Sequence, residues 1–141
     1  MDGEHELPAS AQTEDLMNLG QSRKQTVLLV EDDAMLRSIL AQTLADEGYA
    51  VLTAEDGEPA LAIASTLEGQ LGLVITDIRL PVMNGLELAD RLACLEAPPP
   101  VLFISGVSAD RNVAGPLLAK PFGPSTFLEQ VARLLPSVEQ H

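Results

Sequence analysis

Three short apolar runs in this sequence each end on charged residues. Residues 27–30 lead into Glu31, Asp32 and Asp33, residues 73–76 stop at Asp77, and residues 116–119 are followed by Lys120. If the runs are neighbouring parallel strands, their carboxyl ends lie along one edge of a sheet, where open α/β sheets place ligands. The pattern therefore predicts a pocket of carboxylates with one ammonium group beside them.

Carboxylates that share a pocket repel one another, so they stay ionised only if a cation lies among their oxygens or if their pKa values rise. Hard oxygen ligands favour Mg²⁺, which typically binds through one or two carboxylates and keeps waters that a phosphate can replace. A lysine at the same point would neutralise the phosphate as a compact charge. The chemistry indicated is capture of a phosphoryl group on Asp77.

Length and charge limit the function classes. At 141 residues the chain suits one domain, large enough to bury roughly two-thirds of its unfolded surface. Its net charge of -13 argues against a nucleic-acid partner, because binding a phosphate backbone needs clustered Lys and Arg. Cys94 is the only cysteine, so no internal disulfide forms and a reducing compartment is favoured. With no apolar stretch of ~20 residues and no targeting signal, we expect a cytoplasmic protein without a membrane partner.

The chain divides into one domain and two tails. Residues 1–25 mix acids, Ser, Gln, Gly and Pro with few large apolar groups, so we expect a flexible tail there. Residues 13–17 within it are either a solvated extension or a short turn of helix that binds a partner. The domain is expected over residues 26–136, followed by a short tail over 137–141.

Within the domain, apolar runs alternate with segments of helical period, which is typical of βα units and a mostly parallel sheet. The expected strands are residues 27–30, 49–54, 71–76, 101–104 and 116–119. The expected buried helix positions are Leu36, Ile39, Leu40, Thr43 and Leu44, then Ala60, Leu61, Ile63 and Ala64, then Leu86, Ala89, Leu92 and Ala93, and last Phe127, Leu128, Val131, Leu134 and Leu135.

Single residues at the strand ends have ordinary structural interpretations as well as functional ones. Asp33 fits best as the cap of a helix beginning at Ala34. Ser105 ends the fourth run, where it is either a turn serine or a hydroxyl donor to a phosphoryl oxygen. The Lys120-Pro121 bond is a candidate cis peptide that would aim the ammonium inward.

Together these motifs resemble the receiver domain of two-component response regulators. The resemblance rests on Glu31-Asp32, on Asp77 within the segment 77–85, on Ser105-Gly106 and on Lys120-Pro121-Phe122. It implies an α/β, flavodoxin-like, doubly wound fold with a parallel five-stranded sheet. It also implies that Asp77 accepts a phosphoryl group from a histidine kinase or a histidine phosphotransfer protein, for an unknown downstream protein. By the same resemblance, Asp32, Asp77 and the backbone carbonyl of Arg79 hold Mg²⁺ with Glu31 behind them, while Ser105 and Lys120 contact the phosphoryl group.

Two departures from the family pattern stand out. Leu117 occupies a position where the family usually has an aromatic residue, three before the lysine, which puts the usual conformational relay in question. The segment 107–115 is too short for a full helix, since it allows at most ~13 Å at 1.5 Å per residue. We therefore expect the fourth helix to be short or absent, as in some receivers of hybrid kinases, which the sequence is also similar to.

Three functions compete at this point. The first is a stand-alone phosphorylatable receiver, which is a signalling domain and not an enzyme beyond catalysing its own phosphotransfer and dephosphorylation. The second is a pseudo-receiver, a binding module that works without phosphorylation. The third is an aspartyl phosphatase, whose families place a second acid two residues after the nucleophile, where this chain has Arg79. That residue argues against the third function.

Overall fold

The computed structural model describes residues 25–106, 113 and 115–135, along which five strands alternate with four helices. The strands are β1 (Thr26–Val30), β2 (Ala50–Ala54), β3 (Leu73–Asp77), β4 (Val101–Ser105) and β5 (Leu117–Ala119). The helices are α2 (Ala34–Asp46), α3 (Gly57–Thr66), α4 (Gly85–Leu92) and α5 (Pro124–Leu134). Residues 1–24, 107–112, 114 and 136–141 lie outside the described residues. The expectations for the two tails and for a shortened fourth helix therefore stay predictions.

The strands form one sheet in the order β2-β1-β3-β4-β5, and every neighbouring pair is parallel. Val30 pairs with Thr76, and Asp77 pairs with Ile104. Because all strands run the same way, their carboxyl ends share one edge of the sheet. This confirms the predicted flavodoxin-like, doubly wound architecture.

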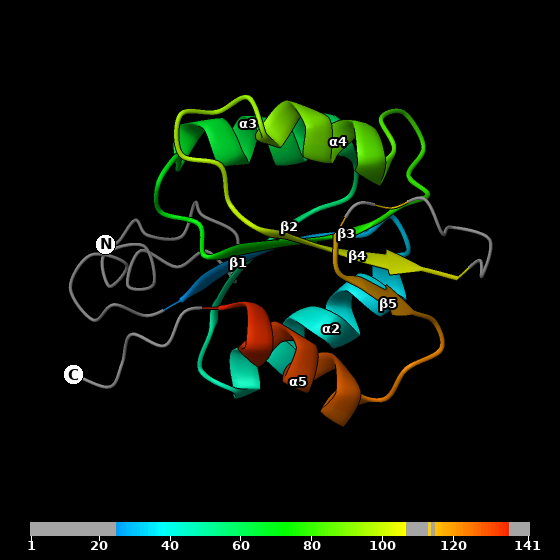
Figure 1. Cartoon of the computed structure of the whole chain (residues 1–141). Coiled ribbons are helices and arrows are strands. Elements are labelled where there is room, and N and C mark those ends of the chain that lie inside the picture. The colour runs from blue at the N-terminus through cyan, green and yellow to red at the C-terminus, as the bar shows by residue number, and fades with distance from the viewer. Residues whose placement is uncertain (1–24, 107–112, 114, 136–141) are drawn as a thin grey trace, which may run out of the picture.

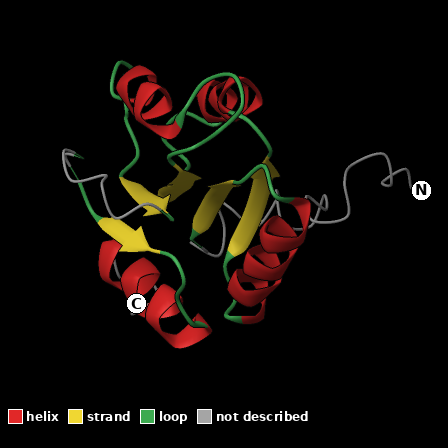
Figure 2. Ribbon diagram, turned by 90° about the vertical axis from the view of Figure 1, so that its right-hand side faces the viewer, coloured by secondary structure: helices red, strands yellow, loops and turns green. Residues whose placement is uncertain are grey.

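Helices cover both faces of the sheet. Figures 1 and 2 show α3 and α4 over one face and α2 and α5 over the other. Along β1, Val27 and Leu29 face one core cluster, while Leu28 and Val30 face the other. A strand that is covered on both faces needs apolar side chains at every position. This explains the uninterrupted apolar runs from which the strands were predicted.

Short polar side chains begin three of the helices. Asp33 accepts hydrogen bonds from the backbone N–H groups of Met35 and Leu36 at 3.0 and 3.1 Å, which confirms its predicted role as a cap. Asp56 and Asn84 cap α3 and α4 in the same way. These caps satisfy N–H groups that have no partner inside a helix.

The predicted buried faces of two helices need correction. Ile39 is 54% exposed, and the buried residues of α2 are Leu40 and Leu44. Leu86 is 39% exposed, and Ala93 is exposed beyond the end of α4. The residues that α4 buries are Gly85, Leu88 and Leu92, of which Leu92 was predicted.

The rotation of α4 follows from the close packing of its first residue. The N–H of Gly85 donates to the carbonyl oxygen of Ile78 at 2.8 Å, and a Cβ built on Gly85 would collide with the carbonyl oxygen of Asp77. Gly85 must therefore face inward, which turns Leu86 outward. No helix among the described residues is both long enough and apolar enough to cross a membrane.

We expect Gly85→Ser to destabilise the fold by roughly 1–3 kcal/mol, the usual cost of forcing extra atoms into a packed site. The matched control is Gly123→Ser, because Gly123 has no atom within 4 Å of a built Cβ and precedes α5, where a serine is a good cap. Urea denaturation of both variants measures the difference. Equal stability of the two variants would show that the contact at Gly85 does not constrain α4.

Candidate functional site

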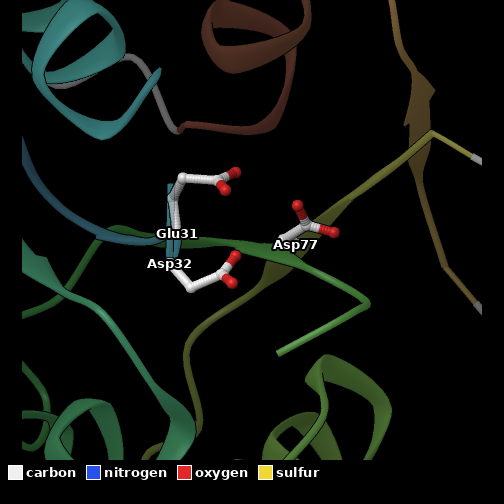
Figure 3. A group of neighbouring side chains, drawn as sticks. All are labelled: Glu31, Asp32 and Asp77. Carbon is white, nitrogen blue, oxygen red and sulfur yellow. The ribbon is translucent and has the colours of Figure 1, made fainter. Parts of the chain in front are cut away.

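Three carboxylates meet at the carboxyl edge of the sheet. Glu31 and Asp32 follow β1, Asp77 ends β3, and one oxygen from each of the three lies within 4.8 Å of the others. Figure 3 shows the carboxylates of Glu31 and Asp32 extending toward the side on which Asp77 lies. Glu31 and Asp77 are buried, whereas Asp32 is exposed. The predicted cluster of carboxylates is therefore present, and it reaches solvent at Asp32.

Both carboxylate oxygens of Asp77 have hydrogen-bond partners. Oδ1 accepts from the backbone N–H of Arg79 at 3.0 Å. Oδ2 accepts from Nζ of Lys120 at 2.8 Å. The Asp77 side chain is only 7% exposed, so the ion pair lies largely out of water, where charge interactions are less screened.

Lys120 brings the predicted ammonium group to the carboxylates. Its Nζ also lies 3.6 Å from Oε1 of Glu31. Partial burial opposes the charged form, but the hydrogen bond to Asp77 and the charges of Asp77 and Glu31 outweigh it and raise the pKa of Lys120 above its ordinary value. The lysine is therefore charged at neutral pH. The Lys120-Pro121 peptide bond, which the sequence offered only as a candidate, is cis.

The Glu31 side chain is buried, and only one of its two carboxylate oxygens has a hydrogen-bond partner. Its Oε2 accepts from the backbone N–H of Asp33 at 3.1 Å, whereas Oε1 is buried and has no hydrogen-bond partner. Burial is the main cause that raises the pKa of Glu31 from 4.5 to about 7; repulsion by Asp77 adds to the rise, and the bond from Asp33 and the charge of Lys120 oppose it. Near neutral pH, Glu31 is poised between its two protonation states.

Ser105 ends β4, and Leu117 begins β5, the strand that Lys120 follows. Ser105 is buried at the carboxyl end of β4, and its carbonyl oxygen accepts from the backbone N–H of Lys120 at 2.7 Å. Ser105 thus sits next to the strand that delivers the lysine. Leu117 is 39% exposed and pairs in register with the buried Phe103 of β4.

Supporting residues that the sequence interpretation did not single out also converge on the site. Arg37 of α2 donates from Nη1 to the carbonyl oxygen of Glu31 at 2.7 Å. Gly57, at the start of α3, packs so closely on Met83 that a built Cβ would lie 2.8 Å from its carbonyl oxygen. The contact between Gly57 and Met83 holds the loop that follows Asp77. Residue types gave no signal for Arg37, because its partner is a main-chain oxygen.

A parallel doubly wound sheet that carries acids and a lysine at its carboxyl edge is the arrangement of a signalling receiver. The response regulator receiver domain matches residues 27–132 of this chain, and the chain belongs to this family. Members of the family are signalling domains of two-component systems that interact with histidine kinases or phosphotransfer proteins.

Curated relatives are response regulators. The chain is 38% identical over 116 residues to the C4-dicarboxylate transport transcriptional regulatory protein DctD of Pseudomonas aeruginosa, and the alignment covers 77% of this chain and 25% of the relative. It is 35% identical over 111 residues to the transcriptional regulatory protein CpxR of Klebsiella pneumoniae, covering 77% of this chain and 47% of the relative. The chain thus spans between a quarter and half of the length of these relatives.

Solved structures of receivers share the fold over most of the chain. The receiver domain of the hybrid histidine kinase CckA is 36% identical, with a TM-score of 0.71, and the alignment covers 79% of this chain and 99% of that one. The chemotaxis protein CheY4 of Vibrio cholerae is 32% identical, with the same TM-score and coverage. The receiver of the sensor histidine kinase PA1611 from Pseudomonas aeruginosa is 23% identical with a TM-score of 0.72 over 79% of this chain and 97% of that one. That structure has a magnesium ion in its active site cleft.

When a chelator has removed divalent cations, we expect the stabilisation that Glu31 contributes to the free energy of unfolding to fall as the pH rises. The pKa of Glu31 is about 7 in the folded chain and 4.5 as the ordinary value, so the folded chain keeps a proton that the unfolded chain has released. The stabilisation is complete below the unfolded pKa and is lost as the pH rises through the folded pKa. The free energy of unfolding of wild type relative to Glu31→Gln should fall by roughly 1–3 kcal/mol over this window.

Urea denaturation at several pH values measures this difference. Glu55→Gln is the matched control, because Glu55 is exposed and its removal should leave the pH profile of wild type unchanged. A profile for Glu31→Gln that runs parallel to that of wild type would contradict the prediction.

Proposed function

We propose that this chain is a phosphorylatable receiver that takes a phosphoryl group onto Asp77 from a phosphohistidine of a histidine kinase or phosphotransfer protein. The observation that carries the proposal is the ion pair between Asp77 Oδ2 and Lys120 Nζ at 2.8 Å, next to two further carboxylates. A buried carboxylate with a charged lysine and a cation site beside it fits a nucleophile toward phosphorus.

The transfer step balances without a further reactant. An oxygen of Asp77 forms a bond to phosphorus while the bond between phosphorus and the imidazole nitrogen breaks, and that nitrogen leaves with the electron pair. Lys120 exchanges its contact with Asp77 for one with a phosphoryl oxygen, so its charge stays paired. The hydroxyl of Ser105 would donate to another phosphoryl oxygen. In phosphoryl transfer, positioning and charge neutralisation supply most of the catalysis.

The carboxylates suit Mg²⁺ as the cation. Hard oxygen donors are the ligands that this ion prefers, and the buried Oε1 of Glu31, which lacks a hydrogen-bond partner, fits a water or ion beside it. Asp32, Asp77 and the carbonyl of Arg79 would hold the ion, with Glu31 behind them. When bound, Mg²⁺ neutralises charge on the phosphoryl oxygens.

The alternative function is a binding module that works without phosphorylation. The pairing of Asp77 with Lys120 favours the phosphorylated receiver over this alternative. A module that works without phosphorylation does not need a buried nucleophile beside a cluster of acids. The output of this chain is proposed to be contact with a downstream protein or onward transfer of the phosphoryl group.

We expect Asp77→Asn to abolish phosphorylation and leave the fold intact, because it removes the nucleophile and keeps the size of the side chain. Intact mass spectrometry after incubation with acetyl phosphate and Mg²⁺ should show one added phosphoryl group on wild type and none on the variant. Asp90→Asn, an exposed acid on α4, is the control and should label like wild type. Labelling of Asp77→Asn equal to that of wild type would refute the assignment, and no labelling of either protein would favour the binding module.

Exposed apolar residues near the acidic segment offer a place for the protein donor. Met35, two residues after Asp33, is 73% exposed, and Val82, in the loop after Asp77, is 70% exposed. We propose that the donor protein packs on Met35 while its phosphohistidine approaches Asp77. In protein interfaces a few residues that become well packed on binding carry most of the energy.

We expect Met35→Glu to slow transfer from a phosphorylated donor protein and to leave labelling by acetyl phosphate unchanged. The reason is that acetyl phosphate needs no docking surface, whereas a charged side chain opposes apolar contact with the donor. Leu86→Glu is the control, since Leu86 is on α4 over the opposite face of the sheet. If Met35→Glu slowed labelling by acetyl phosphate as much as transfer from the donor protein, Met35 would affect the site itself rather than docking.

A further inference from the structure

One residue of α2 holds the main chain on both sides of Asp32. The backbone N–H of Arg37 donates to the carbonyl oxygen of Asp33 at 2.8 Å. Its guanidinium Nη1 donates to the carbonyl oxygen of Glu31 at 2.7 Å. Arg37 therefore binds the carbonyls of the residues immediately before and after Asp32.

Two further hydrogen bonds hold Glu31 at the end of β1. The N–H of Glu31 donates to the carbonyl oxygen of Ala54 at 3.0 Å, and the Glu31 side chain accepts from the N–H of Asp33 at 3.1 Å. These bonds fix the end of β1, and the bond from Arg37 fixes the turn into α2. With Oε2 occupied, Oε1 of Glu31 is the oxygen that lies toward Lys120, at 3.6 Å.

The contact of the Arg37 guanidinium is with backbone rather than with an acid. Within residues 25–106, 113 and 115–135, no carboxylate lies within ion-pair distance of Arg37. A charged donor on a carbonyl oxygen is a short, strong hydrogen bond. The side chain is half-buried, so water competes with this bond only in part.

We propose that Arg37 is a positioning residue, which orients Asp32 and Glu31 toward Asp77 before a cation binds. The inference rests on the proposed function, because it assumes that Mg²⁺ occupies these carboxylates. The charge of Arg37 has the opposite effect, since a guanidinium close to a cation site repels the cation. Loss of positioning therefore weakens Mg²⁺ binding, whereas loss of the charge alone strengthens it. The sign of the change separates the two roles.

The test uses the full chain and two substitutions at one position. Arg37→Met keeps the length of the side chain and removes both charge and donor, and Arg37→Lys keeps the charge and one donor group. Arg91→Met, at an exposed arginine in the last turn of α4, makes the same change in net charge away from the site. Isothermal titration with Mg²⁺ gives the dissociation constant, and labelling with acetyl phosphate gives the half-saturating Mg²⁺ concentration and the maximal rate.

For Arg37→Met we expect a dissociation constant for Mg²⁺ that is about 10-fold or more higher, the usual effect of losing a residue that orients metal ligands. The half-saturating Mg²⁺ concentration should rise in parallel, while the maximal labelling rate is retained. Arg37→Lys should recover affinity at least in part, and Arg91→Met should bind like wild type. If Arg37→Met does not fold, the test rests on the Mg²⁺ affinity of Arg37→Lys compared with that of wild type.

Binding of Mg²⁺ by Arg37→Met that equals or exceeds that of wild type would overturn the positioning role and leave the proposed function standing. Dissociation constants that are equally raised in Arg37→Met and Arg91→Met would also overturn it, because the effect would then not depend on where the arginine lies. A wild-type chain that binds no Mg²⁺ would overturn the proposed cation site, and this inference with it.

Discussion

The ion pair between Asp77 and Lys120 is the interaction on which the site depends. Glu31, Asp32 and Asp77 each place a carboxylate oxygen within 4.8 Å of the others, and Lys120 is the one ammonium paired with Glu31 and Asp77 among the described residues. Burial raises the pKa of Glu31, and repulsion by Asp77 adds to the rise, since one positive charge does not neutralise three acids. The remaining negative charge is what makes the cluster attractive to a divalent cation.

The parallel sheet is what allows such a costly cluster to form. Each charged residue lies at the end of a strand that is otherwise apolar, so the burial of β1 and β3 stabilises a fold whose edge is electrostatically strained. The strands that carry the acids are central in the order β2-β1-β3-β4-β5. The strand that carries the lysine is at the edge of the sheet, where β4 separates it from β3. Structural stability and chemical function are thus placed on different parts of the same strands.

Much of this arrangement could be predicted from the sequence, because a strand covered on both faces leaves an unbroken apolar run. The capping by Asp33 was also predictable, since it depends on neighbours in the chain. The rotation of α4 was not, because Leu86 is apolar and the inward position of Gly85 depends on the distant carbonyl of Asp77. Arg37 was missed for a similar reason: its partner is a main-chain oxygen, which leaves no trace in residue identity.

The loop after β3 is fixed at both ends, and this bounds how the molecule can respond to change at Asp77. Ile78 is buried and bonded to Gly85, and Met83 is buried beneath Gly57. Between these anchors, residues 79–82 are exposed or half-buried. Gly85, the first residue of α4, packs on the carbonyl oxygen of Asp77, so α4 is in contact with the end of β3 without the loop between them. The loop is thus held at Ile78 and Met83, and its middle is the part that solvent and any binding molecule can reach.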